Sequence, residues 1–483
     1  MKKLIFLSAL LWWSGNGLWA QGKKQAAPVQ GVLRTLDEKG AQYAQTAHQI
    51  WQLAELGFME QQSTELLQAA LRQAGFRIET GVAGMPTSFI ATWGSGKPVI
   101  GFLAEYDALP GVSQAAVPVQ QANPTTNNGH ACGHHLFGTG SVAAAIAVKE
   151  WLESTKTPGT IRLYGTPAEE GGGGKVFMVR AGLFSDVDAV LTWHPGSQNA
   201  CSPHSTLAAV GIKFKFHGIA SHAAGAPERG RSALDAVEAL DFMANLMREH
   251  VPEETRIHYV ITRGGEAPNV VPAYAQVNYI IRHPDMGTVR NIQERILRAA
   301  EGAAKGTETR MEYEYETGYF NVLPNLALSE LMYRNLQTVG GVQYTPEERA
   351  FAEKIMTSYP SGNLRPESAA EVAPFETDEH ATPASSDVGD ISWVVPTASM
   401  SAATWAPGTS AHSWQAVAAG GTSIGEKGMM VAAKTMALSA IELYQHPDIA
   451  DKAKQELIRR RGADFKYVSL IGDMPPPLQY RTH

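Results

Sequence analysis

The sequence predicts an α/β protein in which a small α+β unit is inserted into a larger unit with a helix-flanked, mostly parallel sheet. Three observations support this fold class. Strand-like and helix-like stretches alternate over roughly the first 200 residues, the pattern changes after Leu207, and a long helical stretch follows near the end. The chain has 483 residues, 44% of them hydrophobic, which is enough for more than one core.

The larger unit is expected to alternate strands with helices. Short apolar runs predict buried strands, and apolar residues at helical spacing predict helices. The predicted strands are 98–103, 160–165 and 189–193, and the predicted helices are 32–56, 64–74, 136–152 and 176–181. Strands connected by helices lie parallel in most proteins, so the sheet is expected to be mostly parallel.

The inserted unit is expected to have ferredoxin-like order. Its elements follow as strand, helix, strand, strand, helix and strand, which is the order of a split βαβ unit. They are the strands 210–216, 257–261, 275–281 and 310–316, and the helices 232–251 and 289–304. We therefore expect a lid or dimerisation domain at 207–325, between two parts of a catalytic domain at 21–206 and 326–483.

Four further segments complete the prediction. Residues 21–30 are polar and are expected to be disordered. Residues 342–385 are polar, contain proline and show no clear period, which predicts a long surface loop. A short strand is expected near 391–395, and a helix at about 423–444.

The N-terminus has the features of a secretory signal. Lys2 and Lys3 precede an apolar run that ends at Trp13, and small residues continue to Ala20. We expect a signal peptide at 1–20 and a periplasmic or secreted protein, because the apolar run is too short to span a membrane. The net charge of −7, without a basic run, argues against a nucleic-acid partner, and no later segment predicts a membrane span.

Four short stretches contain side chains that bind metals well. The stretches 129–135, 167–170, 193–195 and 410–413 contribute Cys, His and Glu residues. Each follows a predicted strand or precedes a helix, and sites in α/β sheets assemble at the carboxyl ends of strands. Cys, His and Glu are ligands for zinc, and carboxylates also suit manganese. The pattern therefore predicts a metal site.

The neighbouring carboxylates Glu169 and Glu170 predict two different catalytic roles. One can bind a metal while the other accepts a proton from the water that the metal activates. The alternative is that both are acidic residues at a helix N-terminus, where they favour the helix dipole. The Gly171–Gly174 run lacks the Lys-Ser/Thr of a phosphate loop and is interpreted as a flexible turn.

Each single residue also has an ordinary structural interpretation. Cys132 could be a plain buried thiol or form a disulfide with Cys201, and these are the two cysteines of the chain. His194 could be a core histidine and His412 a surface residue. The coincidence of all of them at strand ends favours the metal cluster.

The chain resembles the metallo-aminoacylase and carboxypeptidase family, closest to its amidohydrolases of the aminobenzoyl-glutamate type. The resemblance extends from about residue 100 to 415. It is carried by the stretches AEYDALP at 104–110, GHACGHH at 129–135, TPAEE at 166–170, HP at 194–195, ASHAA at 220–224, GEAPNVVP at 265–272 and SDVGD at 386–390.

The resemblance implies a role for each matching residue. One or two Zn²⁺ or Mn²⁺ ions are expected on Cys132, His134, Glu170, His194 and His412. Glu169 is expected to be the general base and Asp107 to support the site. Glu105 stands where other branches of the family have a histidine, so the usual ligand set of a two-zinc site is not complete here.

The resemblance also implies that the inserted unit takes part in catalysis. His222 matches a histidine that reaches across a dimer to stabilise the oxyanion, a role with a large energetic effect. Asn269 and Arg282 match contacts to the free carboxylate of the substrate, which an arginine fork binds well. The alternatives are a turn residue for His222 and a solvated strand end for Arg282.

The expected function is metal-dependent hydrolysis of the amide bond in N-acyl or N-aroyl amino acids. A metallodipeptidase is one alternative, and a non-catalytic binding protein on the same fold is another. The expected partner is a second copy of the chain in a homodimer. A distinct second subunit is an alternative partner.

Overall fold

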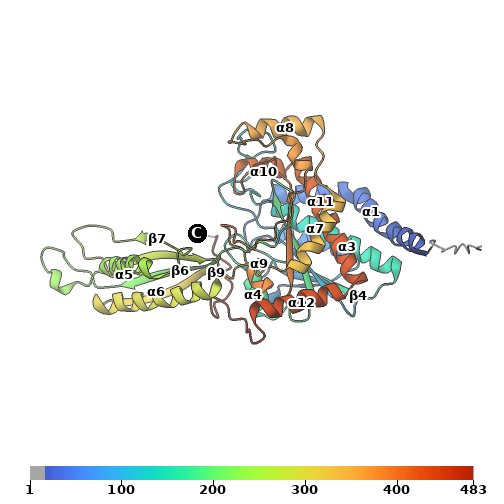
Figure 1. The fold of residues 1–483 in the computed structure, drawn as a ribbon. Coiled ribbons are helices and arrows are strands. Elements are labelled where there is room, and N and C mark those ends of the chain that lie inside the picture. Colours follow the sequence, from blue (N-terminus) through green and yellow to red (C-terminus); the bar gives the residue numbers. More distant parts are fainter. Residues whose placement is uncertain (1–16, 482–483) are drawn as a thin grey trace, which may run out of the picture.

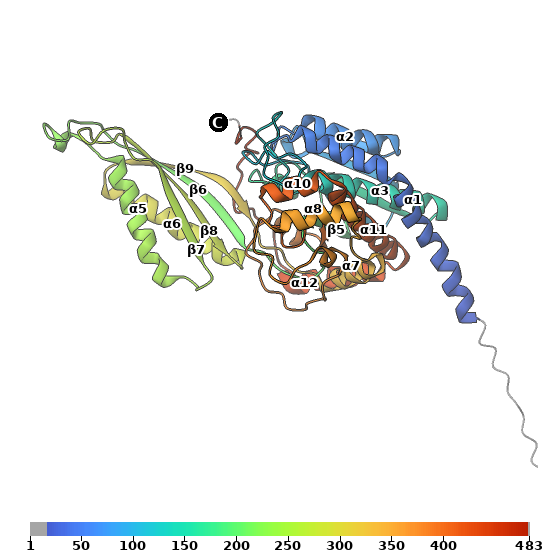
Figure 2. The same ribbon diagram turned by 90° about the horizontal axis from the view of Figure 1, so that it is seen from above.

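The computed structural model describes residues 17–481, and two separate sheets organise them (Figure 1). Each sheet has its own hydrophobic core. Figure 2 shows the smaller sheet, with two helices, extending away from the larger unit. This arrangement confirms the predicted fold class. The predicted signal peptide at 1–20 lies mostly outside the described residues.

The larger sheet has six strands in the order β1-β2-β4-β3-β5-β10. They are β1 (Arg77–Thr80), β2 (Phe89–Ser95), β3 (Val99–Ala104), β4 (Gly159–Gly165), β5 (Ala189–Gly196) and β10 (Thr397–Ala403). Strands β4, β3, β5 and β10 run parallel, whereas β2 is antiparallel to both β4 and β1. Every residue of β3 is buried, as expected for a central strand with both faces covered.

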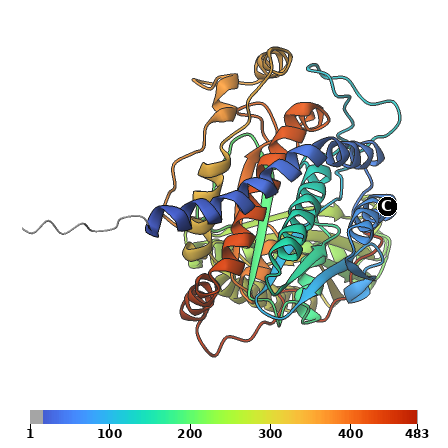
Figure 3. The same cartoon turned by 90° about the vertical axis from the view of Figure 1, so that its right-hand side faces the viewer.

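Helices surround this sheet and form most of the larger core. Helices α3 and α11 pack against the central strands, and α1 crosses over both of them (Figure 3). The helices of this unit are α1 (Gly17–Leu53), α2 (Gln61–Gln73), α3 (His134–Thr155), α4 (Gly174–Arg180), α7 (Leu326–Val339), α8 (Pro346–Met356), α9 (Val388–Ser392), α10 (Trp414–Gly420), α11 (Ser423–Gln445) and α12 (Asp448–Arg461). Short 3₁₀ turns occur at η1 (Val82–Gly84) and η4 (Pro366–Ala370).

The smaller sheet is antiparallel, with the order β7-β8-β6-β9. Its elements are β6 (Ala208–His217), η2 (Pro227–Arg229), α5 (Ala233–Met247), η3 (Arg248–His250), β7 (Arg256–Arg263), β8 (Tyr274–His283), α6 (Met286–Gly306) and β9 (Arg310–Tyr319). Buried residues alternate along β8, because α5 and α6 cover one face of the sheet. The predicted ferredoxin-like order of elements is confirmed, and the boundaries at 207 and 325 stay predictions.

Three local predictions were wrong. Residues 21–30 belong to α1, a segment rich in the good helix formers Lys, Gln and Ala. The expected loop 342–385 contains α8 and η4, and α8 begins with a capping box formed by Thr345 and Glu348. No strand forms at the expected position 391–395, because α9 ends at Ser392 and a turn follows it, and the strand β10 begins after Pro396.

Several elements were not predicted at all, namely β1, β2, α7, α10 and α12. None of the helices in residues 17–481 combines the length and the apolar composition that a membrane crossing requires.

Candidate metal centre

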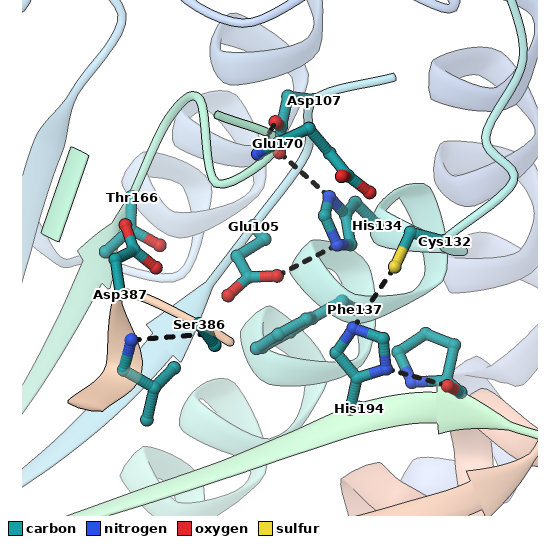
Figure 4. Close-up of polar contacts among 12 residues, drawn as sticks. Glu105, Asp107, Cys132, His134, Phe137, Thr166, Glu170, His194, Ser386 and Asp387 are labelled. Carbon is teal, nitrogen blue, oxygen red and sulfur yellow. Dashed lines mark hydrogen bonds and ion pairs between the residues drawn. The ribbon is translucent and has the colours of Figure 1, made fainter. Parts of the chain in front are cut away.

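The predicted metal ligands converge at the carboxyl end of the parallel strands, and Figure 4 shows four of them, Cys132, His134, Glu170 and His194. Ligand atoms of Cys132, His134 and His194 lie within 4.8 Å of one another, and those of Cys132, Glu170 and His412 do so too. The Cys132 Sγ is 3.4 Å from the His194 Nε2, and the His412 Nε2 is 3.1 Å from the Glu170 Oε1. The structure therefore brings all five residues together.

The turn before α3 places Cys132 and His134 in the cluster. Gly133 separates them and has a φ of 74°, which glycine adopts without strain. A Cβ atom at this position would lie 2.6 Å from the Pro195 Cβ. A side chain at position 133 would therefore push the Cys132 turn away from β5, which carries His194.

The turn between β4 and α4 presents Glu169 and Glu170. Ala168 is buried with a left-handed φ of 57°, and its N–H donates to the Glu60 Oε1 over 2.9 Å. A Cβ on Gly174 would lie 2.1 Å from the Pro167 carbonyl oxygen. The turn leads into a helix as predicted, and it is closely packed.

Hydrogen bonds to Asp107 and Pro195 orient the two buried histidines. The His134 Nδ1 is 2.8 Å from the Asp107 Oδ1, and the His194 Nδ1 is 2.8 Å from the Pro195 carbonyl oxygen. Each ring thus keeps its Nε2 for another partner, as metal-binding histidines commonly do. The Asp107 Oδ2 also accepts from the Glu170 N–H over 2.9 Å, so Asp107 supports two predicted ligands.

A fully buried lysine extends the cluster, and no motif in the sequence pointed to it. The Lys175 Nζ lies 2.7 Å from the Glu105 Oε1 and 2.7 Å from the Asp387 Oδ1. The other oxygen of Glu105, Oε2, lies 3.0 Å from the His134 Nε2. Glu105 therefore connects Lys175 to a predicted ligand, although it replaces the histidine found in other branches.

The electrostatics of the cluster fit a bound cation. Burial raises the pKa of the Cys132 thiol and of the Glu169 carboxyl, and burial lowers the pKa of His194 to about 4. Burial also opposes protonation of His134, but Cys132, Glu105 and Asp107 outweigh it and raise the pKa of His134. A divalent ion would favour the thiolate and the carboxylates that burial disfavours.

Unsatisfied buried atoms support the same conclusion. Among residues 17–481, the Glu105 Oε2, the His134 Nε2 and the Glu170 Oε1 are buried without a hydrogen bond and meet only ion-pair partners. Buried polar atoms usually have partners, so these atoms fit direct bonds to a metal. A second group of potential ligands, His204, Asp378 and His380, is largely exposed.

The disulfide alternative for Cys132 is wrong. Cys132 and Cys201 are both free and buried. The Cys201 thiol donates to the carbonyl oxygens of Ser329 and Ser399, at 3.5 Å each. Cys132 is thus available to bind a metal.

The three residues predicted on the inserted unit do not join the cluster. The His222 Nδ1 accepts from the N–H groups of Ala224 and Gly225 at 3.1 and 3.0 Å. His222 and Asn269 lie on the adjoining loops 218–232 and 264–273, at the end of the smaller sheet that points away from the larger unit (Figures 1 and 2). Arg282 lies near the other end of β8, and its Nε is buried without a hydrogen bond.

Comparison with known proteins identifies the family. The model of peptidase family M20/M25/M40 matches residues 101–437. The chain is 44% identical over 457 residues to one of the subunits of p-aminobenzoyl-glutamate hydrolase of Escherichia coli, a match that covers 89% of this chain and 95% of that protein. It is 28% identical over 455 residues to the Xaa-Arg dipeptidase of Mus musculus, covering 90% of this chain and 94% of that protein.

A solved structure agrees with the fold. The aminobenzoyl-glutamate utilization protein from Klebsiella pneumoniae superposes with a TM-score of 0.59 and 20% identity, covering 86% of this chain and 99% of that chain. The chain therefore belongs to peptidase family M20/M25/M40 and is a metal-dependent hydrolase that cleaves amide bonds.

Proposed function

We propose that the chain hydrolyses the amide bond of N-acyl or N-aroyl amino acids that carry a free carboxylate, such as aminobenzoyl-glutamate. The observation that carries this proposal is the convergence of five potential ligands with Glu169, whose carboxylate groups with Glu105 and His134 within 4.8 Å. The five ligands are Cys132, His134, Glu170, His194 and His412. The substrate class rests on the 44% identity to the Escherichia coli aminobenzoyl-glutamate hydrolase.

The reaction needs a polarised carbonyl, an activated water and a proton carrier. A bound Zn²⁺ or Mn²⁺ supplies the Lewis acidity for the first two. Glu169 takes a proton from the attacking water and delivers it to the leaving amine. Asp107 keeps the His134 ring and the Glu170 backbone in place through its two oxygens.

Two other functions are alternatives. A dipeptidase is favoured by the 28% identity to a mouse Xaa-Arg dipeptidase, and its substrates would carry a basic terminal residue. A binding protein without activity is disfavoured, because Glu169 is retained beside the five converging potential ligands. The Escherichia coli hydrolase has more than one kind of subunit, so a distinct second subunit stays an alternative partner.

Metal content and substrate range test the proposal together. Purified wild type is expected to hold one or two equivalents of Zn²⁺ or Mn²⁺, and Cys132→Ser is expected to lose about one equivalent because the variant lacks the thiolate ligand. The matched control is the double variant His204→Asn/His380→Asn, which removes the exposed histidines and should keep the metal that activity requires.

Activity is then measured on aminobenzoyl-glutamate, acyl amino acids and Xaa-Arg dipeptides. Faster turnover of the aroyl and acyl amino acids supports the proposal, and faster turnover of the dipeptides supports the alternative. Unchanged metal content in Cys132→Ser would contradict the proposed function, and so would the absence of turnover with all of these compounds.

We also propose that two copies form a homodimer through the smaller sheet. Strand β7 is an edge strand, and exposed edges invite pairing with another strand. Apolar side chains are exposed beside this edge, with Val260 on β7 at 57% and Phe242 on α5 at 65%. A partner copy could then bring His222 and Asn269 to the metal centre that they do not reach in their own subunit.

The dimer should depend on this apolar surface. Phe242→Glu is expected to shift the protein from dimer to monomer in sedimentation velocity, because the new carboxylate would be buried in the interface. Activity should fall with it, since the site would lose His222. The matched control is Val119→Glu, a change at an exposed apolar residue of the larger unit. A monomeric wild type would contradict the proposal.

A further inference from the structure

The segment 463–481 crosses from the smaller unit to the metal centre, a path that no sequence pattern predicts. After α12, the Val468 carbonyl oxygen accepts from the Arg290 Nη2 over 2.5 Å, and the Leu470 carbonyl oxygen accepts from the Gln293 Nε2 over 3.0 Å. Both donors lie on α6. Leu470 is buried in the core of the smaller unit, whereas its neighbour Ile471 is buried in the core of the larger unit.

The segment then follows α4 to the turn that carries the two glutamates. The Met474 carbonyl oxygen accepts from the Arg180 Nη1 over 2.5 Å. Farther along, the Tyr480 hydroxyl donates to the Glu170 carbonyl oxygen over 3.0 Å, and the Arg481 Nη2 donates to the same oxygen over 2.6 Å.

The last two side chains of the segment are fixed by packing. The Tyr480 ring meets the Phe58 ring edge-on, with centroids 5.8 Å apart. The Arg481 guanidinium lies over the Tyr480 ring, 4.9 Å from its centroid. Aromatic and cation–π contacts of this kind reduce the freedom of both side chains. The two donors are therefore held in place on the Glu170 carbonyl.

The glutamate turn needs support from outside. Ala168 holds a left-handed conformation that residues with a Cβ rarely adopt, and Gly171 and Gly173 also have positive φ values of 101° and 69°. Within the turn, the Gly171 N–H donates to the Glu169 carbonyl oxygen over 2.7 Å. The next carbonyl, that of Glu170, bonds to Tyr480 and Arg481.

We propose that Tyr480 and Arg481 are positioning residues that hold the Glu169–Glu170 turn in the geometry needed for metal binding and proton transfer. This inference rests on the proposed function of Glu169 and Glu170. Residues that orient metal ligands affect metal affinity and turnover by about 10- to 100-fold when they are removed. Both residues act through the Glu170 carbonyl oxygen, so the Michaelis constant should change little.

Three variants test the proposal in the full-length protein. Tyr480→Phe keeps the ring and removes the donor, and Arg481→Met removes the charge. Arg481→Lys keeps a cationic donor that can reach the same carbonyl. The matched control is Arg334→Met, at an exposed arginine on α7 that pairs with Glu442.

The Zn²⁺ dissociation constant is measured by competition with a chelator, together with kcat, KM and Tm. Tyr480→Phe and Arg481→Met are expected to weaken Zn²⁺ binding and lower kcat by about 10-fold or more. Arg481→Lys should recover most of both, and Arg334→Met should match wild type. Unchanged Zn²⁺ affinity and kcat in both variants would overturn the proposal, and so would a rise in KM alone. A wild type without Cys132-dependent metal would instead overturn the proposed function.

Discussion

Replacing Glu169 with Gln is expected to lower kcat by about 10²- to 10⁴-fold, the usual contribution of a general base. Gln has the size of Glu and can fill the same position, but it cannot accept a proton from the attacking water. Glu169 lies beside Glu170 and near Glu105, so removing its negative charge also lowers the repulsion among the carboxylates. The cluster should therefore keep its metal.

Turnover of an aroyl amino acid and metal content are measured on the same preparations. The matched control is Glu65→Gln, at an exposed glutamate on α2 that pairs with Arg72. It should leave both quantities unchanged. Full turnover by Glu169→Gln would remove this residue from the proton-transfer step. Loss of the metal together with activity would show that Glu169 serves as a ligand and not as the base.

The ligands of the site could be predicted because their chemistry is unusual at those places in the sequence. Cys132, His134 and His194 follow or precede predicted strands and helices, and strand ends meet at one edge of a parallel sheet. The smaller unit could be predicted because its strands are half-exposed and therefore alternate clearly.

Other features depend on contacts that no local pattern reveals. Apart from Thr397, strand β10 consists of Ala, Ser and Met residues, which are not enriched in strands, and it forms because β5 pairs with it. Helix α8 is different, because the Thr345 and Glu348 of its capping box are a local signal that could have predicted its start. The contact of Tyr480 with Glu170 joins residues 310 positions apart, so only the folded chain shows it.

Lys175 is the most important residue near the site that no sequence pattern indicated. It is fully buried, and lysine is rarely buried without a partner. Its partners Glu105 and Asp387 are distant in sequence and become neighbours only through β3 and α9. The Asp387 carboxylate accepts from both the Lys175 backbone N–H, at 2.9 Å, and its Nζ. One cation therefore faces two buried carboxylates, with Glu169 as a third acidic neighbour.

Lys175→Met is accordingly expected to destabilise the protein by about 3–5 kcal/mol, the usual result of removing one partner from a buried ion pair. Methionine fills similar space, so the loss would come from carboxylates left buried without a cation. Urea unfolding of wild type and variant measures the change. Asp387→Asn in the Lys175→Met background should recover part of the lost stability, because one uncompensated charge is removed.

The matched control is Lys149→Met, which breaks an ion pair with the half-exposed Glu153 and should cost about 0–1 kcal/mol. A similarly small cost for Lys175→Met would show that the burial of Glu105 and Asp387 does not depend on the lysine charge. It would also contradict the interpretation that Lys175 supports His134 through Glu105.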